Sequence, residues 1–477
     1  MPAADMKSRE RSLFGHPIGL SFLFTTEMAE RFCYYGMTAI LVYYLTEQLL
    51  LPGHTEHVWG YLAVKGAYES VLGRLSAEEF ASNIAGLYTG LVYLTPFFGG
   101  MLADRVWGQR YTVIGGGVLM AIGEFMLVDE TLFFPGLLLM IIGNGGFKPN
   151  ISTQVGNLYQ PGDSRIDRAY SIFYVGINIG ATLAPLICGT LGEEVAWRWG
   201  FFAGGVGLTL GVIVYLFGLR TLPPDRVTRA RREGTKVARA PLTRQDWKAI
   251  IAIVVLLVPT TLFWAAYQQQ SITILFWARD FTDRTLIPGL SNFQIPATWS
   301  QSVNPFMIFA FTPVLIWYWA RQARRGTEPL TIDKMVIGCA LLTISFVIMA
   351  AVAWMVGPHG RASWAWLLVH FSIYTVGELY LSPIGLALVA RVAPPQVLSM
   401  MMGAWFVSNF IGNTLAGYMG GFWDQMSKPK FFLLIAALGA ASVVITWLLR
   451  FPLKPILHRD EAPAAPAEPV AGGSTVA

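Results

Sequence analysis

The chain has 477 residues, of which 54% are hydrophobic and only 13% are charged, and its formal net charge is +5. Soluble domains usually contain about a quarter charged residues, so this composition excludes a large water-soluble fold. The stretches AIIAIVVLLVPTTLFWAAY and FFLLIAALGAASVVITWLL are about as long as the ~20 residues that a helix needs to cross a bilayer. We therefore predict an all-α membrane protein that crosses the bilayer many times.

Hydropathy and helix-breaking residues predict twelve transmembrane helices in chain order. Their ranges are 19–49, 82–103, 110–130, 132–155, 167–191, 199–220, 248–279, 302–320, 333–357, 363–390, 396–423 and 430–450. The domains that follow from these ranges are a tail at 1–18, a six-helix bundle at 19–220, a basic linker at 221–247, a second six-helix bundle at 248–451 and a disordered tail at 452–477. The long loop 51–80 is expected to hold a short helix.

Lysine and arginine counts predict the orientation, because cytoplasmic segments carry the excess of these residues. With both termini inside, the inner segments hold 24 of the 34 basic residues and the outer loops hold eight. We therefore expect both termini in the cytoplasm and a plasma-membrane location of the bacterial inner-membrane type. The basic linker is expected to lie near anionic lipid headgroups, and nucleic-acid binding is not expected in this setting.

Two basic residues, Arg31 and Lys148, belong to no loop of this layout. Charged side chains inside a membrane span are costly and usually mark a binding site or an ion pathway. Arg31 lies in EMAERFCYYG, where helical periodicity places Glu27, Glu30 and Arg31 on one face. Two carboxylates beside one guanidinium can take up a proton without leaving an isolated charge. A purely structural knot of ion pairs is the alternative.

Lys148 lies in GNGGFKPN, within the fourth predicted helix. A buried lysine needs an anion, and we expect the Glu27 and Glu30 pair to supply it. The cluster then contains two negative and two positive charges. The alternative is a lysine whose long side chain extends to the membrane interface.

The segment GGMLADRVWGQR (99–110) follows the second predicted helix. It resembles the loop motif G-x-L-A-D-R-x-G-(R/K) of the major facilitator transporters. This resemblance implies the major facilitator fold, in which two six-helix bundles face each other, and a gating role on the cytoplasmic side for Asp104 and Arg105. The motif identifies a fold and does not identify a solute.

Several further segments resemble the proton-dependent oligopeptide transporters, a branch of the major facilitators. EMAERFCYYG matches ExxERFxYYG, while FYVGINIG and GNGGFKPN are similar to the fifth-span and fourth-span signatures of that family. NPFMIFAFTPVLIW, GELYLSPIGLALVARVAP and MGAWFVSNFIGN resemble its later spans. The similarity runs in order over about 20–425, and the chain is identified as a member of the family.

The resemblance implies uptake of di- and tripeptides, driven by a proton gradient, through alternating access between the two bundles. It implies a peptide carboxylate near Arg31 and Lys148 and a peptide amino group near Glu378, which suits a dipolar solute. The substrate-binding residues that it implies are Arg31, Tyr34, Tyr35, Tyr93, Lys148, Asn178, Trp264, Gln268, Asn304, Glu378, Ser382 and Trp405. A structural role for Glu378, and a packing role for the two tryptophans, remain open.

The chain departs from the family pattern at two positions. Members typically carry a glutamate where this chain has Gln268, and often an arginine where it has Thr38. In the family these positions are associated with a salt bridge that helps to close the outer gate, so we count Thr38 as a gating position. Because Gln268 cannot titrate, we expect proton coupling to depend on the cluster of Glu27, Glu30, Arg31 and Lys148. A function for Glu124 is left open.

The sequence shows no metal-ligand spacing, no phosphate-binding loop and no nucleophile–base pair, so we expect neither an enzyme nor a metal site. The proton is the only cofactor-like species expected, as the coupling ion. The expected partners are di- and tripeptides, protons and membrane lipid, with a monomer as the working unit. Two rival functions remain open: a carrier of another solute, such as nitrate or drug-like or peptidomimetic compounds, and a peptide sensor that does not transport.

Overall fold

The computed structural model describes residues 12–13, 15–160, 163, 165–223, 242–286, 293–394 and 397–457. Most of the predicted N-terminal tail, most of the linker at 221–247 and the tail beyond 457 therefore lie outside the described residues. Their predicted roles remain predictions.

Long helices dominate the described part of the chain. Those of 18 residues or more are α1 (Gly19–Tyr44), α3 (Ala77–Leu102), α4 (Gln109–Met126), α5 (Phe133–Asn157), α6 (Ile166–Ala184), α7 (Trp197–Gly218), α9 (Arg244–Tyr267), α11 (Ser300–Arg324), α12 (Thr331–Val356), α13 (Ala365–Val392), α14 (Leu398–Gly420) and α15 (Lys428–Leu457). Nine stretches of the described residues are long and apolar enough to cross a membrane. They include all of these helices except α1, α4 and α14. The helical membrane fold is confirmed, while the count of twelve spans remains a prediction.

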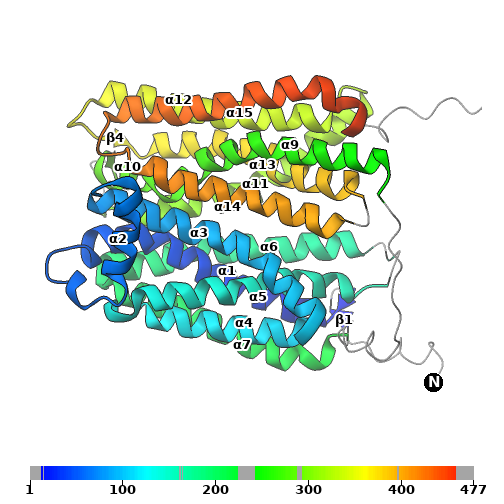
Figure 1. The fold of residues 1–477 in the computed structure, drawn as a ribbon, viewed down its shortest axis with the longest axis horizontal. Helices are drawn as coiled ribbons and strands as arrows, with labels where there is room; N and C mark the ends of the chain where they lie inside the picture. The colour runs from blue at the N-terminus through cyan, green and yellow to red at the C-terminus, as the bar shows by residue number, and fades with distance from the viewer. Residues whose placement is uncertain are drawn as a thin grey trace, which may run out of the picture.

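Short elements lie at both ends of the long helices (Figure 1). The helix expected within 51–80 is present as α2 (Tyr61–Leu72), and α10 (Thr273–Asp280) continues the direction of α9. There are two small sheets among the described residues, and each consists of two strands of two residues. In the first, β1 (Ser12–Leu13) pairs antiparallel with β2 (His16–Pro17); in the second, β3 (Thr282–Asp283) pairs parallel with β4 (Ala362–Ser363). Figure 1 shows α2, α10 and β4 at one end, and the chain's N-terminus at the other. We call these the α2 end and the N-terminal end.

Helices from the first half of the chain and helices from the second half form two layers in Figure 1. Across the boundary, α3 packs along α14, and α6 packs along α11. Small residues permit the first contact, since a Cβ atom on Gly86 would lie 2.6 Å from the backbone of Asn413 and of Gly417. Close backbone approach through small residues is the usual way in which membrane helices pack. The helices of the two halves therefore form two groups, called bundles below, that contact each other along these pairs, as Figure 1 shows; the expected bundle boundaries stay predictions.

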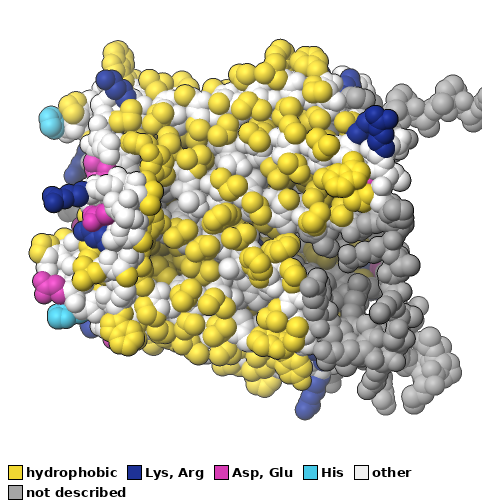
Figure 2. All heavy atoms as spheres, viewed as in Figure 1, with side chains coloured by type: hydrophobic (Ala, Val, Ile, Leu, Met, Phe, Trp, Pro, Cys, Tyr) yellow, Lys and Arg dark blue, Asp and Glu magenta, His cyan; other side chains and the backbone are white. Residues whose placement is uncertain are grey.

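Apolar side chains cover the flank of the molecule. Figure 2 shows hydrophobic groups spread over the middle of the helices, with charged groups near the α2 end and further Lys or Arg side chains at the opposite end. Large residues such as Phe217 and Trp354 are 75% and 78% exposed. A soluble protein rarely exposes so much contiguous apolar surface, whereas lipid tails accept it.

Helix starts in this chain follow local capping rules. The Ser76 side chain accepts from the backbone of Glu79 at the start of α3, and the Glu79 carboxylate accepts from the backbone of Ser76. Thr243 and Asp246 form the same reciprocal arrangement at the start of α9. Each arrangement satisfies two backbone N–H groups that a helix start would otherwise leave unpaired.

The contact between α3 and α5 gives a test of the packing. A Cβ atom on Gly99 would lie 1.9 Å from the carbonyl oxygen of Gly145, which is backbone and cannot rotate away. We expect Gly99→Ala to destabilise the detergent-purified protein by about 2 kcal/mol or more, measured as a lower apparent Tm. Gly115→Ala is the matched control, because nothing lies within 4 Å of its added atom. Equal Tm values for the two variants would contradict this packing.

Candidate functional site

A buried charged cluster lies on α1. Arg31 Nε donates to Glu30 Oε2 at 2.5 Å, and a second guanidinium nitrogen donates to Glu30 Oε1 at 2.6 Å. Glu27 Oε1 lies farther away, 3.4 Å from Arg31 Nε. These three residues are at most 3% exposed. Helical spacing thus brings together the three residues that the sequence singled out.

Asn144 of α5 completes the surroundings of Glu30. Its amide donates to Glu30 Oε1 at 2.9 Å, and Asn144 is itself fully buried. Glu30 is therefore held by one charge-assisted pair and one neutral donor. By contrast, Glu27 Oε2 is buried and has no hydrogen-bond partner among the described residues. The two carboxylates of the cluster have different environments.

Lys148 of α5 lies against an aromatic ring. Its ammonium lies 4.3 Å from the centre of the Tyr93 ring, over the aromatic face. It forms no ion pair at contact distance with a described residue, while Glu27 and Glu30 act on its charge from farther away. An aromatic face can attract a cation, and the pairing of Lys148 with the two glutamates stays a prediction.

A cavity of about 170 Å³ lies between the two bundles. Ten of the twelve predicted substrate-binding residues line it: Tyr34, Tyr35, Tyr93, Asn178, Trp264, Gln268, Asn304, Glu378, Ser382 and Trp405. Arg31 and Lys148 do not line it, but each contacts a tyrosine that does, since the guanidinium carbon of Arg31 lies 5.0 Å from the centre of the Tyr34 ring. The cluster on α1 and α5 therefore lies behind an aromatic wall of the cavity.

Glu378 of α13 is fixed by polar neighbours in its own bundle. Asn304 of α11 donates to Glu378 Oε2 at 2.9 Å, and the same amide donates to Thr375 Oγ1 at 3.0 Å. Tyr267 donates its hydroxyl hydrogen to Asn304 Oδ1 at 3.4 Å. None of these partners is a cation. The carboxylate thus faces the cavity with its negative charge uncompensated by a described basic group at contact distance.

The structure adds cavity residues that sequence reasoning missed. Tyr267, Gln270, Ser271, Phe406 and Asn409 line the cavity beside the expected residues. The helix changes to 3-10 geometry at η8 (Gln268–Ser271), directly after α9. In this geometry the side chains of residues three apart align, which places Gln268 and Ser271 on one side, while Gln269 points away and donates to the backbone of Ala416. The unusual polar run QQQS inside an apolar span was the available signal.

The predicted gating residues have separate outcomes. Thr38 lines the cavity, and its hydroxyl donates to the backbone carbonyls of Tyr34 and Tyr35 at 3.0 and 3.2 Å. Gln268 lines the same cavity. Asp104 and Arg105 belong to the π-helix η3 (Ala103–Trp107), but their side chains lie outside what the structure describes.

Glu124 of α4 is completely buried, away from the cavity. Neither carboxylate oxygen has a hydrogen-bond partner among the described residues. A Cβ atom on Gly204 would lie 2.5 Å from Glu124 Oε1, so α7 has a glycine where this carboxyl group packs. The structure gives this group a tight space and no partner that defines a role.

A second, larger cavity of about 550 Å³ adjoins the first, since Asn178 lines both. Its other lining residues come from α5, α6 and α11 and are mainly apolar, including Tyr170, Tyr174, Phe309 and Ile316. The lining residues of α6 lie mainly in the first half of that helix, which begins near the N-terminal end. The second cavity lies between α6 and α11, and several of its lining residues, such as Phe309 and Ile316, are exposed.

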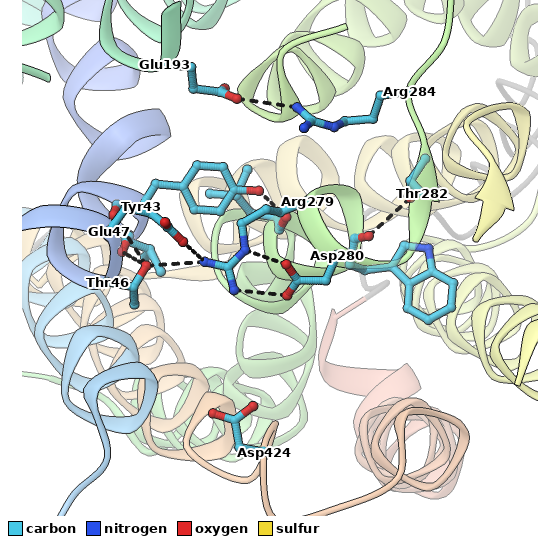
Figure 3. A network of polar contacts seen from close by, with 12 residues as sticks. Tyr43, Thr46, Glu47, Glu193, Arg279, Asp280, Thr282, Arg284 and Asp424 are labelled. Atoms are coloured by element: carbon cyan, nitrogen blue, oxygen red, sulfur yellow. Dashed lines mark hydrogen bonds and ion pairs between the residues drawn. The ribbon is translucent and has the colours of Figure 1, made fainter. Parts of the chain in front are cut away.

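A polar network joins the bundles at the α2 end, shown in Figure 3. Arg279 of α10 pairs with Glu47 of η1 (Leu45–Leu49) at 2.5 Å and with its own neighbour Asp280 at 2.6 Å. Arg284 lies 3.5 Å from Glu193 of η6 (Leu191–Val195). No sequence pattern singled out these residues, which fall in predicted loops or at the ends of predicted spans.

Comparison with known proteins identifies the family. The model of the POT family matches residues 110–238 and 232–434. The chain belongs to the POT family of proton-dependent oligopeptide transporters. As a member of this family the protein is a membrane transporter and not an enzyme.

Relatives of the POT transporter match it along nearly all of its length. An uncharacterized transporter of Bacillus subtilis is 33% identical and matches over 94% of this chain and 96% of its own. A peptide transporter of Yersinia enterocolitica is 31% identical, over 94% and 97%. A di-/tripeptide transporter of Lactococcus lactis is 31% identical, over 95% and 98%.

Solved structures of POT transporters share the fold. A peptide transporter POT in complex with sulfate matches with a TM-score of 0.78 and 28% identity, over 96% of this chain and 99% of the other. A POT family transporter in complex with 5-aminolevulinic acid matches with a TM-score of 0.77 and 25% identity, over 94% and 98%. The organisation into two bundles is therefore that of the family.

The pairing of Arg31 gives a test of the cluster. Removing one partner of a buried ion pair leaves an uncompensated charge, at a cost of about 3 kcal/mol or more. We expect Glu30→Ala to lower the apparent Tm of the purified transporter clearly, because Glu27 lies too far from Arg31 to replace both bonds. Glu69→Ala is the control, since its pair with Lys65 is 4.0 Å long and partly exposed. An equally small effect of both changes would refute the geometry.

Proposed function

We propose that this POT transporter is a proton-coupled symporter that imports di- and tripeptides across the plasma membrane by alternating access. The observation that carries the proposal is the central cavity, which has a cation and tyrosines behind one wall and a carboxylate on the other. The relatives named peptide or di-/tripeptide transporters support the solute class. The transporter is proposed to work as a monomer, with both termini in the cytoplasm and the α2 end outside.

A zwitterionic peptide matches the polarity of this cavity. Its amino group is proposed to bind Glu378, the carboxylate that Asn304 holds at the cavity surface. Its carboxylate is proposed to be attracted by Lys148, acting past Tyr93. Arg31 contributes less net charge because Glu30 binds it through two hydrogen bonds. Opposite charges at the two sides therefore orient the dipole of the peptide.

Aromatic residues bound the remaining space. Trp264, Trp405 and Phe406 line the cavity and are proposed to form the walls that meet peptide side chains. Amide and hydroxyl groups of Asn178, Gln268 and Ser382 are proposed to bind the peptide backbone. Such neutral groups tolerate many side chains, which fits a carrier of short peptides with varied sequences.

Proton coupling is proposed to depend on the α1 cluster. Glu27 is the better acceptor, because its Oε2 atom has no described hydrogen-bond partner whereas both oxygens of Glu30 are engaged. A proton on Glu27 would neutralise the net charge of Glu27, Glu30 and Arg31 and would change the field at Lys148. Gln268 cannot take this role.

A second candidate is a small zwitterion other than a peptide. One matched POT structure holds 5-aminolevulinic acid, and another, of a variant transporter, holds alafosfalin. A cavity of about 170 Å³ is small enough to favour such solutes. Competition between dialanine and 5-aminolevulinic acid for uptake distinguishes the two.

The first functional prediction concerns Glu378. Purified protein in liposomes with an acidic outside should accumulate labelled dialanine, and Glu378→Gln should reduce the initial rate at least tenfold, because the peptide amine loses its counter-charge. A charge-assisted hydrogen bond of this kind contributes about 1.5–3 kcal/mol. Glu69→Gln, on α2, is the matched control with unchanged uptake. Full activity of Glu378→Gln, or no dialanine uptake by the parent, would contradict the proposal.

The second prediction separates proton coupling from peptide binding. Glu27→Gln should abolish accumulation against a dialanine gradient, yet it should retain exchange of internal for external peptide, since exchange needs no net proton movement. Glu124→Gln, which alters a buried carboxyl group distant from the cavity, is expected to keep both activities. Gradient-driven accumulation by Glu27→Gln would refute the assignment of the proton to Glu27.

A further inference from the structure

Glu193, in the first bundle, makes several contacts with the second bundle that the sequence did not predict. Its Oε1 accepts from the backbone N–H of Thr298 at 2.8 Å and from the hydroxyl of Thr298 at 2.5 Å. Its Oε2 accepts from the backbone N–H of Ala297 at 3.0 Å and lies 3.5 Å from Arg284. Figure 3 shows Glu193 and Arg284 facing each other at the α2 end. One carboxylate of the first bundle thus takes four contacts from the second.

The partners of Glu193 are the leading N–H groups of a helix. Ala297 and Thr298 belong to η9 (Ala297–Trp299), which runs directly into α11. The first N–H groups of a helix have no partner within the helix, and a carboxylate there is favoured by hydrogen bonding and by the helix dipole. Such a cap usually comes from the same chain segment. Here it comes from the other bundle, so separating the bundles at this end uncaps α11.

The same turn of α11 carries further bonds to the first bundle. Ser302 donates to the backbone carbonyl of Thr182 at 2.8 Å, and Gln301 donates to that of Ala39 at 3.4 Å. Trp299 donates from its indole to Thr190 Oγ1 at 2.8 Å. The start of α11 is thereby held against α1, α6 and the segment that follows α6.

Position along α11 connects this contact to the solute cavity. Asn304, which holds Glu378, lies less than two turns after Thr298 on the same continuous helix. A shift of the capped start would move Asn304 relative to Glu378. The capping contact and the amine-binding carboxylate are therefore coupled through one rigid element.

We infer that Glu193 is a positioning residue that closes the α2 end of the cavity and sets α11 for solute binding. This inference rests on the proposed alternating-access function. Thr38 and Gln268 are neutral and cannot form a salt bridge with each other, so the inference assigns the closing role to Glu193. Arg279 and Glu47 form a second link, but Arg279 also binds its neighbour Asp280 through two hydrogen bonds, so part of its charge is compensated within its own bundle.

The test measures opening at the α2 end directly, in purified protein without solute. Spin labels at Leu62 and Trp354, which are 81% and 78% exposed on opposite bundles, report the distance by pulsed electron spin resonance. Glu193→Ala should raise the population with a longer distance at least tenfold, because two caps and an ion pair are lost. Glu194→Ala is the matched control, since this neighbour is exposed and forms no hydrogen bond or ion pair with a described residue.

Two more variants keep the test decisive if Glu193→Ala does not fold. Thr298→Val removes one hydroxyl donor from the opposite side of the contact and should shift the population in the same direction, by less. Glu193→Asp retains the charge and should recover most of the closed population. An unchanged distance distribution in Thr298→Val and, where they fold, in Glu193→Ala and Glu193→Gln would overturn the inference.

The kinetic parameters of uptake distinguish a positioning role of Glu193 from a purely structural one. With dialanine as the probe, Glu193→Gln should raise KM several-fold more than it lowers the maximal rate, because α11 is less often set for binding. Equal effects on both parameters would overturn the positioning role. If the parent does not transport dialanine, the proposed function fails, while the distance measurement still tests whether Glu193 closes this end.

Discussion

Compensation of charge inside a low-dielectric interior is the constraint on which this structure depends. An isolated buried ion is far too costly to keep, so Arg31 is bound by Glu30 through two hydrogen bonds, with Asn144 completing the shell. Glu27 and Lys148 lie outside this tight pair and form no ion pair with each other. They are therefore the groups of the cluster that we propose respond to a proton or to a dipolar solute.

The cavity uses the same constraint in a different way. Glu378 has neutral partners and no described cation at contact distance, while the ammonium of Lys148 lies over the face of Tyr93 and has no described carboxylate at contact distance. A dipolar solute between the bundles can compensate both charges at once. Under the proposed function, binding and charge compensation are the same event, and this is the reason that we propose for opposite charges on opposite bundles.

Closure between the bundles is achieved by backbone capping as well as by ion pairs. Thr38 and Gln268 share the central cavity as neutral groups, and the charged contacts occur farther toward the α2 end, at Glu193 and at Arg279 with Glu47. A carboxylate that binds helix N–H groups keeps its charge solvated by protein dipoles. These contacts join the two bundles outside the central cavity.

Sequence alone determined the membrane class, the cluster on one face of α1, the short helix within 51–80 and most cavity-lining residues, because hydropathy, helical periodicity and family motifs are local properties. It did not determine which carboxylate Arg31 binds or that Lys148 lies over Tyr93, since those contacts depend on where Asn144 and Tyr93 lie after the helices pack. The roles of Gln270, Ser271 and Glu193 likewise appeared only in the folded chain. A change of helix pitch and the approach of a second bundle are set by packing over long sequence separations, which no local pattern encodes.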